Sequence, residues 1–357
     1  MYNKPQTKPM LMPIINESST AILIGGFQEN IARELEVDDP NRFIELLKFL
    51  DGTQDKDSIC DKFSMDDHEF QDLMTDLHQN GIIQENNPNI VGFHGDEECL
   101  FSRNINFFSW IDIDGVYYNY WETQKKLKNS KILLLGGGGT GSNCANSLAR
   151  LGIGEITIVD IDKIELSNLN RQLFAFDDIG EYKSIALSNN LKKINPFIKT
   201  SPIVQKINTL NDLISLGDSF DLVVCCIDTP NNINSLVDDF AVFTGIPAVL
   251  GSYANTVITS SIFSKNSVRY KNVFLEGCSG YVAKSIHENE FWQWDNSAIS
   301  PVVSISGCIL TMLALYQLVG LGDVRHGVIH HMDMFNIHNN AFSYYIPENK
   351  KPDIKPD

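Results

Sequence analysis

The chain has 357 residues, which is long enough for one large domain and a smaller second one, each with its own hydrophobic core. Its 45 acidic and 28 basic residues give a formal net charge of -17, which disfavours binding to nucleic acids and to anionic membranes because both are negatively charged. No uninterrupted apolar run is long enough to cross a bilayer, and the N-terminus lacks the basic flank and apolar core of a signal peptide. We therefore expect a cytoplasmic protein that binds neither nucleic acid nor membrane.

The N-terminal part of the chain divides into three predicted segments. Residues 1–19 are polar, and we expect a flexible tail. Residues 20–85 predict a small α/β domain that opens with a strand at Ala21–Ile24, and residues 86–99 are rich in Asn, Pro and Gly, which predicts a linker. The later elements of the small domain are expected near Asn41–Leu50, Ile59–Phe63, Met65–Asn80 (helices) and Ile82–Ile83 (strand). Helices that end in a short strand are typical of a winged-helix-like module.

Residues 100–357 predict a Rossmann-like α/β domain with a mostly parallel sheet. After an N-terminal arm near Leu100–Tyr120, strands and helices alternate, which favours parallel strands joined by helices that cover the sheet. The strands are expected at Ile132–Leu135, Glu155–Val159, Pro202–Ile207, Leu222–Ile227, Pro247–Leu250 and Val257–Phe263. The helices are expected at Ser142–Leu151, Lys183–Ile194, Asn231–Thr244 and Val302–Leu318. Two later strands are expected to add antiparallel edges, at Val328–Met334 and Ala341–Tyr345.

A glycine-rich turn follows the first strand of the large domain. Its pattern G-x-G-G-x-G is formed by Gly136, Gly138, Gly139 and Gly141. Glycines let backbone amides approach a phosphate at the positive end of the next helix, and Asp160 after the second strand can bind ribose hydroxyls. This pattern alone fits NAD, FAD, S-adenosylmethionine or ATP. A Walker-type P-loop is excluded because Ser142 stands where that loop requires lysine.

A polar cluster beyond the ribose-binding acid favours ATP among these ligands. It comprises Asp162, Asn168, Arg171, Gln172 and Lys183. Asn168 can bridge phosphate oxygens, while Arg171 and Lys183 supply positive charge to a triphosphate. A nicotinamide-dependent oxidoreductase, an alternative from a different class, has no need of such a cluster.

The glycine turn and the polar cluster together resemble the ThiF/MoeB superfamily of ubiquitin-activating-type adenylating enzymes. The motifs run from Gly136 to Lys183 as G-x-G-G-x-G, D-x-D, S-N-L-x-R-Q and G-x-x-K, and they continue with D-L-V-V-C-C-I-D at residues 221–228. They cover about the first half of the large domain, and their order and spacing are specific. The resemblance implies ATP and Mg²⁺ as cofactors.

The resemblance also implies roles for individual residues. Arg171 and Lys183 hold the phosphates, and Asp228 organises magnesium and the reacting α-phosphate. The implied nucleotide contacts are Gly136, Gly138, Gly139, Gly141, Asp160, Asp162, Asn168, Gln172 and Asn232. Arg103 lies in a tract that resembles the N-terminal arm of the family, whose arginine reaches the γ-phosphate in the partner subunit of a homodimer. A surface ion pair is the alternative reading of Arg103.

The chain departs from many members of this family in its cysteines. It has seven, an odd number, without any C-x-x-C pair, which indicates reduced thiols and disfavours the paired-cysteine zinc site of sulfur-transfer relatives. Cys278 lies in the loop 264–300, where ubiquitin-activating members place a catalytic cysteine, although a structural role is favoured for it. The aromatic residues of that loop could cover the substrate or pack against a partner subunit. If no cysteine acts, a group on the substrate must attack the acyl-adenylate.

The small N-terminal domain resembles PqqD-like domains, which grip the leader peptides of ribosomally made natural products. The resemblance rests on residues 44–53 and 70–84, and the strand Ala21–Ile24 is expected to offer its edge to an extended peptide. Such a domain before an adenylating domain is the arrangement of family members that modify microcin and pantocin precursor peptides. We therefore predict adenylation of a carboxylate on a precursor peptide, followed by cyclisation or dehydration. Activation of the C-terminal glycine of a ubiquitin-like or sulfur-carrier protein and a catalytically silent leader-binding partner are the alternatives.

Overall fold

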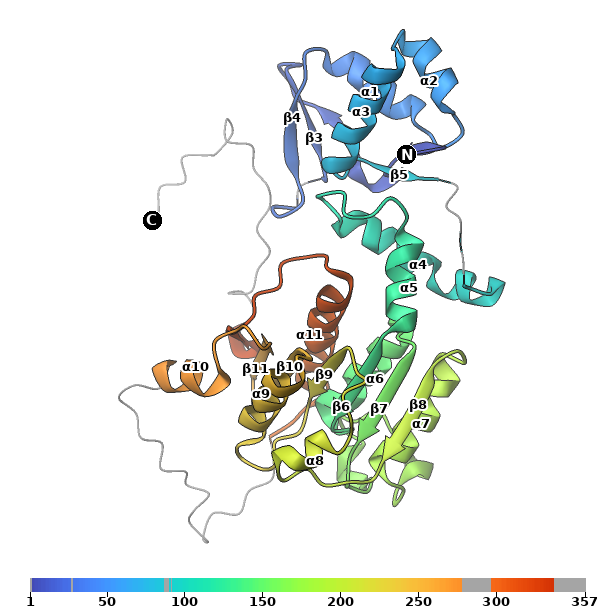
Figure 1. Ribbon diagram of the computed structural model, residues 1–357. Helices are drawn as coiled ribbons and strands as arrows, with labels where there is room; N and C mark the ends of the chain where they lie inside the picture. Colours follow the sequence, from blue (N-terminus) through green and yellow to red (C-terminus); the bar gives the residue numbers. More distant parts are fainter. Residues whose placement is uncertain (1, 27, 87–89, 91, 278–296, 337–357) are drawn as a thin grey trace. The chain divides into compact units, whose positions relative to one another are not determined.

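The computed structural model describes the chain except for residues 1, 27, 87–89, 91, 278–296 and 337–357 (Figure 1). Two compact units emerge, of which the first contains residues 1–125 and the second residues 126–340. We predicted that the large domain begins at residue 100, but helix α4 (Gly95–Ile111) falls in the first unit. The reason is local packing, because Phe101 and Phe108 are buried and Ser109 Oγ donates a hydrogen bond to Gln84 Oε1 at 2.7 Å.

The first unit contains two small antiparallel sheets and a group of helices. Strands β2 (Ile14–Ile15), β3 (Ala21–Ile24) and β4 (Arg33–Glu36) form one sheet in that order, and β1 (Pro5–Thr7) pairs with β5 (Ile83–Glu85) in the other. The helices are α1 (Pro40–Phe49), α2 (Lys56–Phe63), α3 (Asp67–Gln79), α4 and α5 (Tyr120–Asn129), with a short 3₁₀ turn η1 (Pro9–Leu11). The winged-helix-like description of this unit stays a prediction.

Aspartates fix where the first three helices begin. Asp39, Asp55 and Asp66 each accept a hydrogen bond from a backbone N–H in the first turn of the helix that follows, which satisfies donors that have no partner within the helix. The apolar faces of these helices then pack on β3, whose four residues are all buried. The core of the unit therefore lies between β3 and the helices.

The expected flexible tail at residues 1–19 is folded. Pro5–Thr7 pair in register with Ile83–Glu85, and the side chains of Tyr2 and Leu11 enter the core. The segment is polar in composition, but its few apolar residues occupy buried positions. Strand pairing and the burial of these residues together give the segment a fixed structure.

The strand Ala21–Ile24 does not offer the edge that we expected. β3 has the predicted bounds, but it is the central strand of its sheet, paired with β4 along its length and with β2 at Ile22 and Leu23. The neighbouring strand β4 was missed from the sequence, and its alternating exposed glutamates mark it as an edge strand. Any added strand must therefore pair elsewhere than on β3.

The second unit confirms the prediction of a mostly parallel α/β sheet (Figure 1). Its seven strands lie in the order β12-β11-β10-β9-β6-β7-β8, in which β8, β7, β6, β9 and β10 are parallel, β11 is antiparallel to β10, and β12 is antiparallel to β11. The strands are β6 (Lys131–Leu135), β7 (Glu155–Val159), β8 (Lys199–Ile203), β9 (Leu222–Cys225), β10 (Ala248–Ala254), β11 (Val257–Phe263) and β12 (Ile329–Asp333). The helices are α6 (Gly139–Leu151), α7 (Lys183–Ile194), α8 (Leu210–Ile214), α9 (Ile233–Thr244), α10 (Tyr270–Gly277) and α11 (Ser300–Val319), and two 3₁₀ turns are η2 (Leu166–Asn168) and η3 (Phe176–Asp178).

Most predicted elements of the second unit match the observed ones closely. β7, β11 and α7 have the predicted bounds, whereas β8 begins three residues earlier than predicted, at Lys199, and ends at Ile203. Pro202 is tolerated inside the strand because β8 lies at the edge of the sheet. The predicted strand at 341–345 lies outside the described residues.

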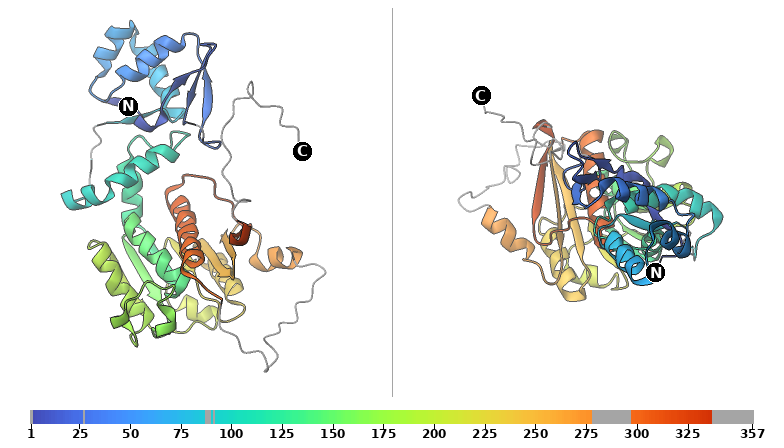
Figure 2. Two further views of the ribbon diagram at one scale, coloured as in Figure 1. Left: turned by 180° about the vertical axis from the view of Figure 1, so that it is seen from behind. Right: turned by 90° about the horizontal axis from the view of Figure 1, so that it is seen from above.

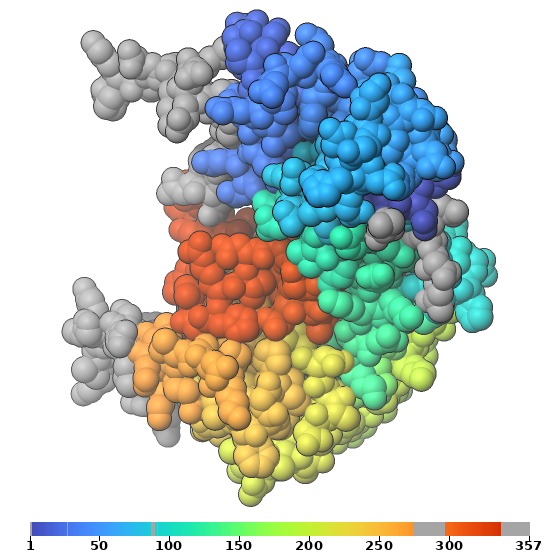
Figure 3. Space-filling view, turned by 45° about the horizontal axis from the view of Figure 1, so that its top comes forward, coloured from blue at the N-terminus to red at the C-terminus, as the bar shows by residue number. Residues whose placement is uncertain are grey.

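Helices cover both faces of this sheet (Figure 2). On one face, α8 and α9 pack with alternate residues of β6, β9 and β10 in a buried cluster that includes Leu133, Val223 and Phe240. On the other face, α11 packs against α6, β9, β10 and β11. By length and composition α11 is the one described helix that could cross a bilayer, with a mean hydropathy of 2.0, but half of this segment is buried inside the protein. Most of its other residues are half-buried, and Figure 3 shows the orange-red surface of this part of the chain.

Lys8 is an unusually buried cation in the first unit. Its ammonium group donates to the Asp112 carbonyl oxygen at 2.7 Å and lies 5.1 Å from the centre of the Tyr120 ring. Burial lowers the pKa of Lys8 to about 8. The unfolded chain therefore binds more protons at Lys8 than the folded chain does between this pKa and the ordinary value of 10.5, so stability rises with pH in that window.

Replacing Lys8 by Met should flatten this pH dependence. Between about pH 8 and 9.5 the wild-type protein should gain about 1.5 kcal/mol of unfolding free energy from Lys8 that Lys8→Met does not gain. Urea denaturation followed by circular dichroism at several pH values measures the difference. Lys48→Met, at an exposed lysine of α1, should keep the wild-type slope, and an identical slope in Lys8→Met would contradict the assignment.

Arg269 holds the start of α10 against α9 in the second unit. Its Nε donates to the fully buried Asp238 carboxylate at 2.6 Å, and the Tyr270 backbone N–H donates to the same oxygen at 3.1 Å. Among the described atoms, the other carboxylate oxygen of Asp238 has no hydrogen-bond partner. Removing the arginine would therefore leave a buried negative charge without its cation.

Arg269→Met should destabilise the second unit by about 3 kcal/mol because it uncovers this buried charge. Arg325→Met is the matched control, because Arg325 pairs with Asp323 at 3.0 Å with both side chains exposed, and such pairs contribute less than about 1 kcal/mol. Urea unfolding of both variants gives the comparison. Equal losses of unfolding free energy in the two variants would contradict the claim that the buried Asp238 carboxylate depends on Arg269.

Candidate nucleotide-binding site

The predicted site residues of the second unit gather at the carboxyl ends of three adjacent parallel strands. β6 lies at the centre, with β7 on one side and β9 on the other, so the chain order reverses there. The glycine turn follows β6, Asp160 follows β7, and Asp228 lies three residues beyond β9. Ligands of open α/β sheets bind at such a switch point, because the loops diverge there and leave a crevice.

Close packing explains two of the motif glycines. Gly136 has a φ of +97°, and a Cβ there would lie 2.6 Å from Ile227 Cγ2. A Cβ on Gly141 would overlap the Gly136 carbonyl oxygen. These positions therefore need glycine so that the turn can fit between the end of β9 and the start of α6.

Gly138 differs, because a Cβ at this position would meet nothing in the described protein closer than Gln172 Nε2 at 4.0 Å. Gly139 beside it is crowded, since its Cβ would lie 2.7 Å from Val303 Cγ1. Gly138 precedes the first turn of the 13-residue helix α6, whose free backbone amides attract anions. The space at Gly138 therefore fits a ligand phosphate.

Asp160 connects the glycine turn to the neighbouring strand. Its carboxylate accepts hydrogen bonds from the Gly137 backbone N–H at 2.7 Å and from the Asp162 backbone N–H at 2.8 Å. Burial raises the pKa of Asp160, while these two hydrogen bonds and Lys183 act in the opposite direction. Each carboxylate oxygen keeps a further lone pair, so the predicted ribose contact is compatible with this geometry.

Lys183 lies at the N-terminus of α7 beside the turn. Its Nζ donates to Asp162 Oδ2 at 2.9 Å; only 10% of the lysine side chain is exposed, against 62% of the aspartate side chain. Lys183 Cβ also lies 3.6 Å from where a Cβ of Gly137 would be. The structure thus brings Asp160, Asp162 and Lys183 together at the glycine turn, as the sequence predicted.

Arg171 and Asn168 are held by the loop that follows η2. The Arg171 guanidinium donates to the Ser167 carbonyl oxygen at 3.0 Å and to Asn170 Oδ1 at 2.8 Å, which keeps it folded over its own loop. Asn168 is buried and accepts from the Glu165 backbone N–H at 3.2 Å. Gln172 is also buried, and its Oε1 has no partner among the described atoms. The Gln172 side-chain nitrogen lies 4.0 Å from where a Cβ of Gly138 would be, so it can donate a hydrogen bond to a phosphate in that space.

Asp228 and Asn232 lie on the loop between β9 and α9, and both are exposed. Within the described part of the chain, no three or more His, Cys, Asp or Glu side chains gather to hold a metal. Mg²⁺ bound with a nucleotide needs only one or two carboxylates because phosphate and water supply the remaining ligands. A single exposed carboxylate at the switch point therefore fits the predicted role of Asp228.

Sequence reasoning missed several residues that shape the turn. Asn143 Nδ2 donates to the Gly139 carbonyl oxygen at 2.9 Å and to the Arg171 carbonyl oxygen at 3.3 Å, which ties the turn to the arginine loop. The Tyr253 hydroxyl lies 3.6 Å from where a Cβ of Gly139 would be. The cluster of polar residues at the start of α6 was a signal for Asn143, but nothing local to the sequence around Tyr253 predicts its approach.

The cysteines of β9 are poor nucleophiles. Burial raises the pKa of Cys225 to about 12 and also raises the pKa of Cys226 well above its ordinary value. This agrees with the prediction of a core position for Cys225, whereas Cys226 follows β9 and is only partly buried. Cys278 and the loop aromatics Phe291, Trp292 and Trp294 lie outside the described residues.

Arg103 lies on α4 in the first unit. It is exposed and, with Met10, Phe107 and Trp110, lines a hollow of about 600 Å³. That Arg103 contacts the γ-phosphate of a nucleotide bound to a partner subunit stays a prediction.

Comparison with known proteins agrees with this site, because residues 101–355 match the ThiF family. The chain belongs to the ThiF family. Molybdopterin-synthase adenylyltransferase of Escherichia coli is 30% identical over 240 residues, which cover 66% of this chain and 88% of that protein. Adenylyltransferase and sulfurtransferase UBA4 of Yarrowia lipolytica is 38% identical over 143 residues, and this chain spans only 36% of its length.

Solved structures share the fold over most of the chain. The structure of E. coli MccB with succinimide has a TM-score of 0.69 at 21% identity, covering 96% of this chain and 98% of that one. The structure of PaaA has a TM-score of 0.65 at 21% identity and covers 90% of this chain and 98% of that one. At this level of identity the likeness establishes a common fold.

Gly138→Ala should weaken ATP binding about tenfold or more while leaving the fold intact, because the added methyl group enters the space for the phosphate but meets no described protein atom. Titration calorimetry with ATP and Mg²⁺ measures affinity, and thermal unfolding measures stability. Gly95→Ala is the control, since a Cβ there also meets nothing within 4 Å but lies at the start of α4. Equal affinity in Gly138→Ala would remove the turn from the binding site.

Proposed function

We propose that the protein uses ATP to adenylate a carboxylate on a ribosomally made precursor peptide, and that a nucleophile within the peptide then displaces AMP. The first unit recognises the peptide, and the second unit carries out the chemistry. The protein acts as a homodimer in which Arg103 reaches the nucleotide of the partner subunit. The product is a cyclised or dehydrated peptide of the antibiotic or bacteriocin class.

The observation that carries the adenylation step is the space at Gly138, in front of the N-terminus of α6 and next to Gly137, which Lys183 approaches. A helix N-terminus and an ammonium group together favour a polyphosphate. Membership of the ThiF family adds support, because the relatives named above are adenylyltransferases.

The chemistry follows from charge. The peptide carboxylate attacks the α-phosphorus, a new C–O–P linkage forms, and the bond to the departing pyrophosphate breaks. Lys183 and Arg171 offset the negative charge that builds up on the phosphates, and the α6 backbone amides orient them. Bound Mg²⁺, held by Asp228, would add further positive charge at the phosphates. AMP leaves when a nucleophile of the peptide attacks the activated acyl carbon.

The peptide-modifying part of the proposal is supported by how much of the chain its solved neighbours match. MccB and PaaA cover 96% and 90% of this chain, which is more than residues 126–340 contain. E. coli MccB has been solved with ATP, and separately with AMPCPP and MccA. A first unit placed before an adenylating unit thus has a counterpart of matching length in these proteins.

The second candidate is adenylation of the C-terminal glycine of a ubiquitin-like or sulfur-carrier protein. The names of the curated relatives favour it, since they include a sulfur carrier protein adenylyltransferase of Thermus thermophilus that is 34% identical over 134 residues. Those residues cover only 37% of this chain and leave the first unit without a role. The absence of C-x-x-C pairs from the sequence weighs against this candidate as well.

Pyrophosphate release from ATP with Mg²⁺ separates the candidates. Purified protein should release pyrophosphate with one of a panel of peptides containing Asp, Glu or Asn, and mass spectrometry should find AMP and a dehydrated peptide. Release that depends on a carrier protein instead would establish the second candidate. Peptide binding with no release in either case would identify a catalytically silent recognition partner.

Arg171→Ala and Lys183→Ala should each lower peptide-dependent pyrophosphate release at least 100-fold, because each removes a positive charge from the developing transition state. Lys163→Ala is the matched control, since the Lys163 ammonium lies 5.0 Å from the centre of the Tyr182 ring, near the site but assigned no catalytic role. Unchanged release in the first two variants would refute the catalytic assignment.

A further inference from the structure

Tyr253 lies at the carboxyl end of β10, on the opposite side of β6 from the predicted ribose contact. The strands run in the order β7-β6-β9-β10, with Asp160 just after β7 and Tyr253 near the end of β10. β10 continues beyond Leu250, which pairs with Cys225 at the end of β9, so Tyr253 stands at the edge of the sheet where the crevice opens. Its half-buried side chain therefore borders the site on the side away from the ribose.

Packing against α11 fixes the position of this side chain. Gly251 precedes Tyr253 by two residues and faces the same side of the sheet, and a Cβ on Gly251 would overlap Leu310 Cδ2, so β10 rests directly on α11. The Tyr253 hydroxyl lies 3.6 Å, and its Cε1 3.8 Å, from where a Cβ of Gly139 would be. The polar end of the ring is therefore the part that approaches the start of α6, next to the space for the phosphate.

The hairpin that carries Tyr253 has no charged side chain. Residues 248–263, which form β10, β11 and the turn between them, include no Asp, Glu, Lys, Arg or His. Lys183 and Arg171 lie in the segment between β7 and β8 instead. A departing pyrophosphate carries several negative charges and is bound best by cations, whereas the acyl group of an acyl-adenylate is uncharged. The hairpin therefore suits the acyl group better than the pyrophosphate.

We propose that the Tyr253 hydroxyl donates a hydrogen bond to the acyl oxygen of the adenylated peptide and stabilises the negative charge that forms on this oxygen when the nucleophile attacks. This inference rests on the proposed function, because it assigns a residue to the second step of that reaction. A phenol hydroxyl can direct its hydrogen toward such an oxygen by rotating about its C–O bond. Tyr253 is thereby a catalytic residue of the second step.

The charge on the acyl oxygen determines which step the hydroxyl accelerates. During adenylation one carboxylate oxygen bonds to phosphorus and the other loses negative charge as it becomes the carbonyl oxygen, so a donor to it gives no acceleration. In the second step the lone pair of the nucleophile bonds to the acyl carbon, and the C=O π pair moves onto the oxygen. That pair then re-forms the carbonyl, the C–O bond to AMP breaks with its electrons going to AMP, and the proton of the nucleophile passes to solvent. The oxygen is fully charged between these two events, where a donor lowers the barrier.

Two stable nucleotide analogues test this contact without a peptide. N-acetylsulfamoyl-adenosine mimics an acyl-adenylate, and sulfamoyl-adenosine lacks its acyl group. Tyr253→Phe should bind the acylated analogue about fivefold more weakly than the wild type does and the other analogue equally well, because only the hydrogen bond to the acyl oxygen is lost. Titration calorimetry with the full chain measures both affinities. Equal weakening for both analogues would assign the hydroxyl to the nucleotide, and no weakening for either would show that it contacts neither; each result overturns the proposal.

The kinetics of Tyr253→Phe separate the two steps of the reaction. With a peptide that supports pyrophosphate release, the variant should keep ATP–pyrophosphate exchange within about threefold of the wild-type rate and should form product about 100-fold more slowly. Mass spectrometry of acid-quenched single turnovers should then find accumulated acyl-adenylate. Because phenylalanine keeps the ring, a purely structural role would not slow one step alone. Equal slowing of exchange and product formation would overturn the assignment.

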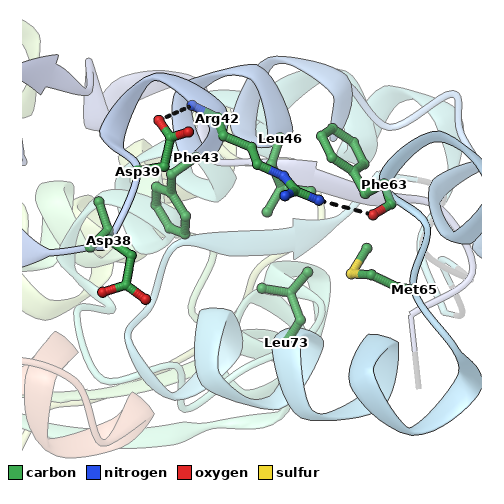
Figure 4. A pocket seen from close by; sticks show the side chains of 9 residues that line it. Asp38, Asp39, Arg42, Phe43, Leu46, Phe63, Met65 and Leu73 are labelled. Atoms are coloured by element: carbon green, nitrogen blue, oxygen red, sulfur yellow. Dashed lines mark hydrogen bonds between the residues drawn. The ribbon is translucent and has the colours of Figure 1, made fainter.

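Two control variants lie elsewhere in the chain. Tyr316→Phe also removes the hydroxyl of a half-buried tyrosine, but it lies on α11 about 20 Å along the helix from Val303, the residue that approaches Gly139. Leu73→Ala enlarges an apolar hollow of about 310 Å³ in the first unit, where Leu73 on α3 faces Leu46 on α1 (Figure 4). Both variants should keep the wild-type ratio of acyl-adenylate to product, even where the second one changes the affinity for the peptide.

Two outcomes separate this inference from the proposed function. Peptide turnover in which Tyr253→Phe keeps the wild-type ratio of acyl-adenylate to product would overturn the inference and leave the adenylation proposal standing. Tyr253-dependent binding of the acylated analogue, without pyrophosphate release from any peptide or carrier protein, would support the contact and remove the proposed reaction.

Discussion

The close approach of the glycine turn to the strands on either side of β6 is the constraint on which the candidate site depends. Gly136 leaves no room for a side chain against Ile227, and Gly137 donates to Asp160 at the end of β7. The turn is therefore fixed to both neighbouring strands by backbone contacts. Because the start of α6 follows directly, its free amides point into the same crevice, and the space at Gly138 is a consequence of this packing.

A protein with a net charge of -17 must still accommodate an anionic substrate. It does so by fixing a few basic side chains near the glycine turn. Lys183 forms an ion pair with Asp162, and the Arg171 guanidinium donates to the Ser167 carbonyl oxygen. These partners are weak competitors for a phosphate, since Asp162 is largely exposed and a neutral carbonyl binds a guanidinium less strongly than a phosphate does. Such a site can exchange its internal contacts for contacts to a nucleotide with little movement.

The sequence predicted the second unit better than the first for a physical reason. Its buried strands and amphipathic helices carry long periodic signals, so β7, β11 and α7 were found with their bounds, and motif spacing grouped Asp162 with Lys183. In the first unit, β1 and β2 have only three and two residues, too few for a periodic signal, and β1 pairs with a strand almost eighty residues further along the chain. The same limit applies to Tyr253, which reaches Gly139 through the sheet and leaves no local pattern.

The folded N-terminal segment determines which strand edges of the first unit stay unpaired. β1 covers β5, and β2 covers part of β3, so backbone groups that would otherwise attract an added strand are already paired. Within the described residues this leaves β4 paired with β3 alone. Edge strands of soluble proteins usually carry charges that discourage pairing with other chains. Here the exposed side chains of Glu34 and Glu36 supply such charges on β4, so the N-terminal segment and these two glutamates together protect the strand edges of the first unit.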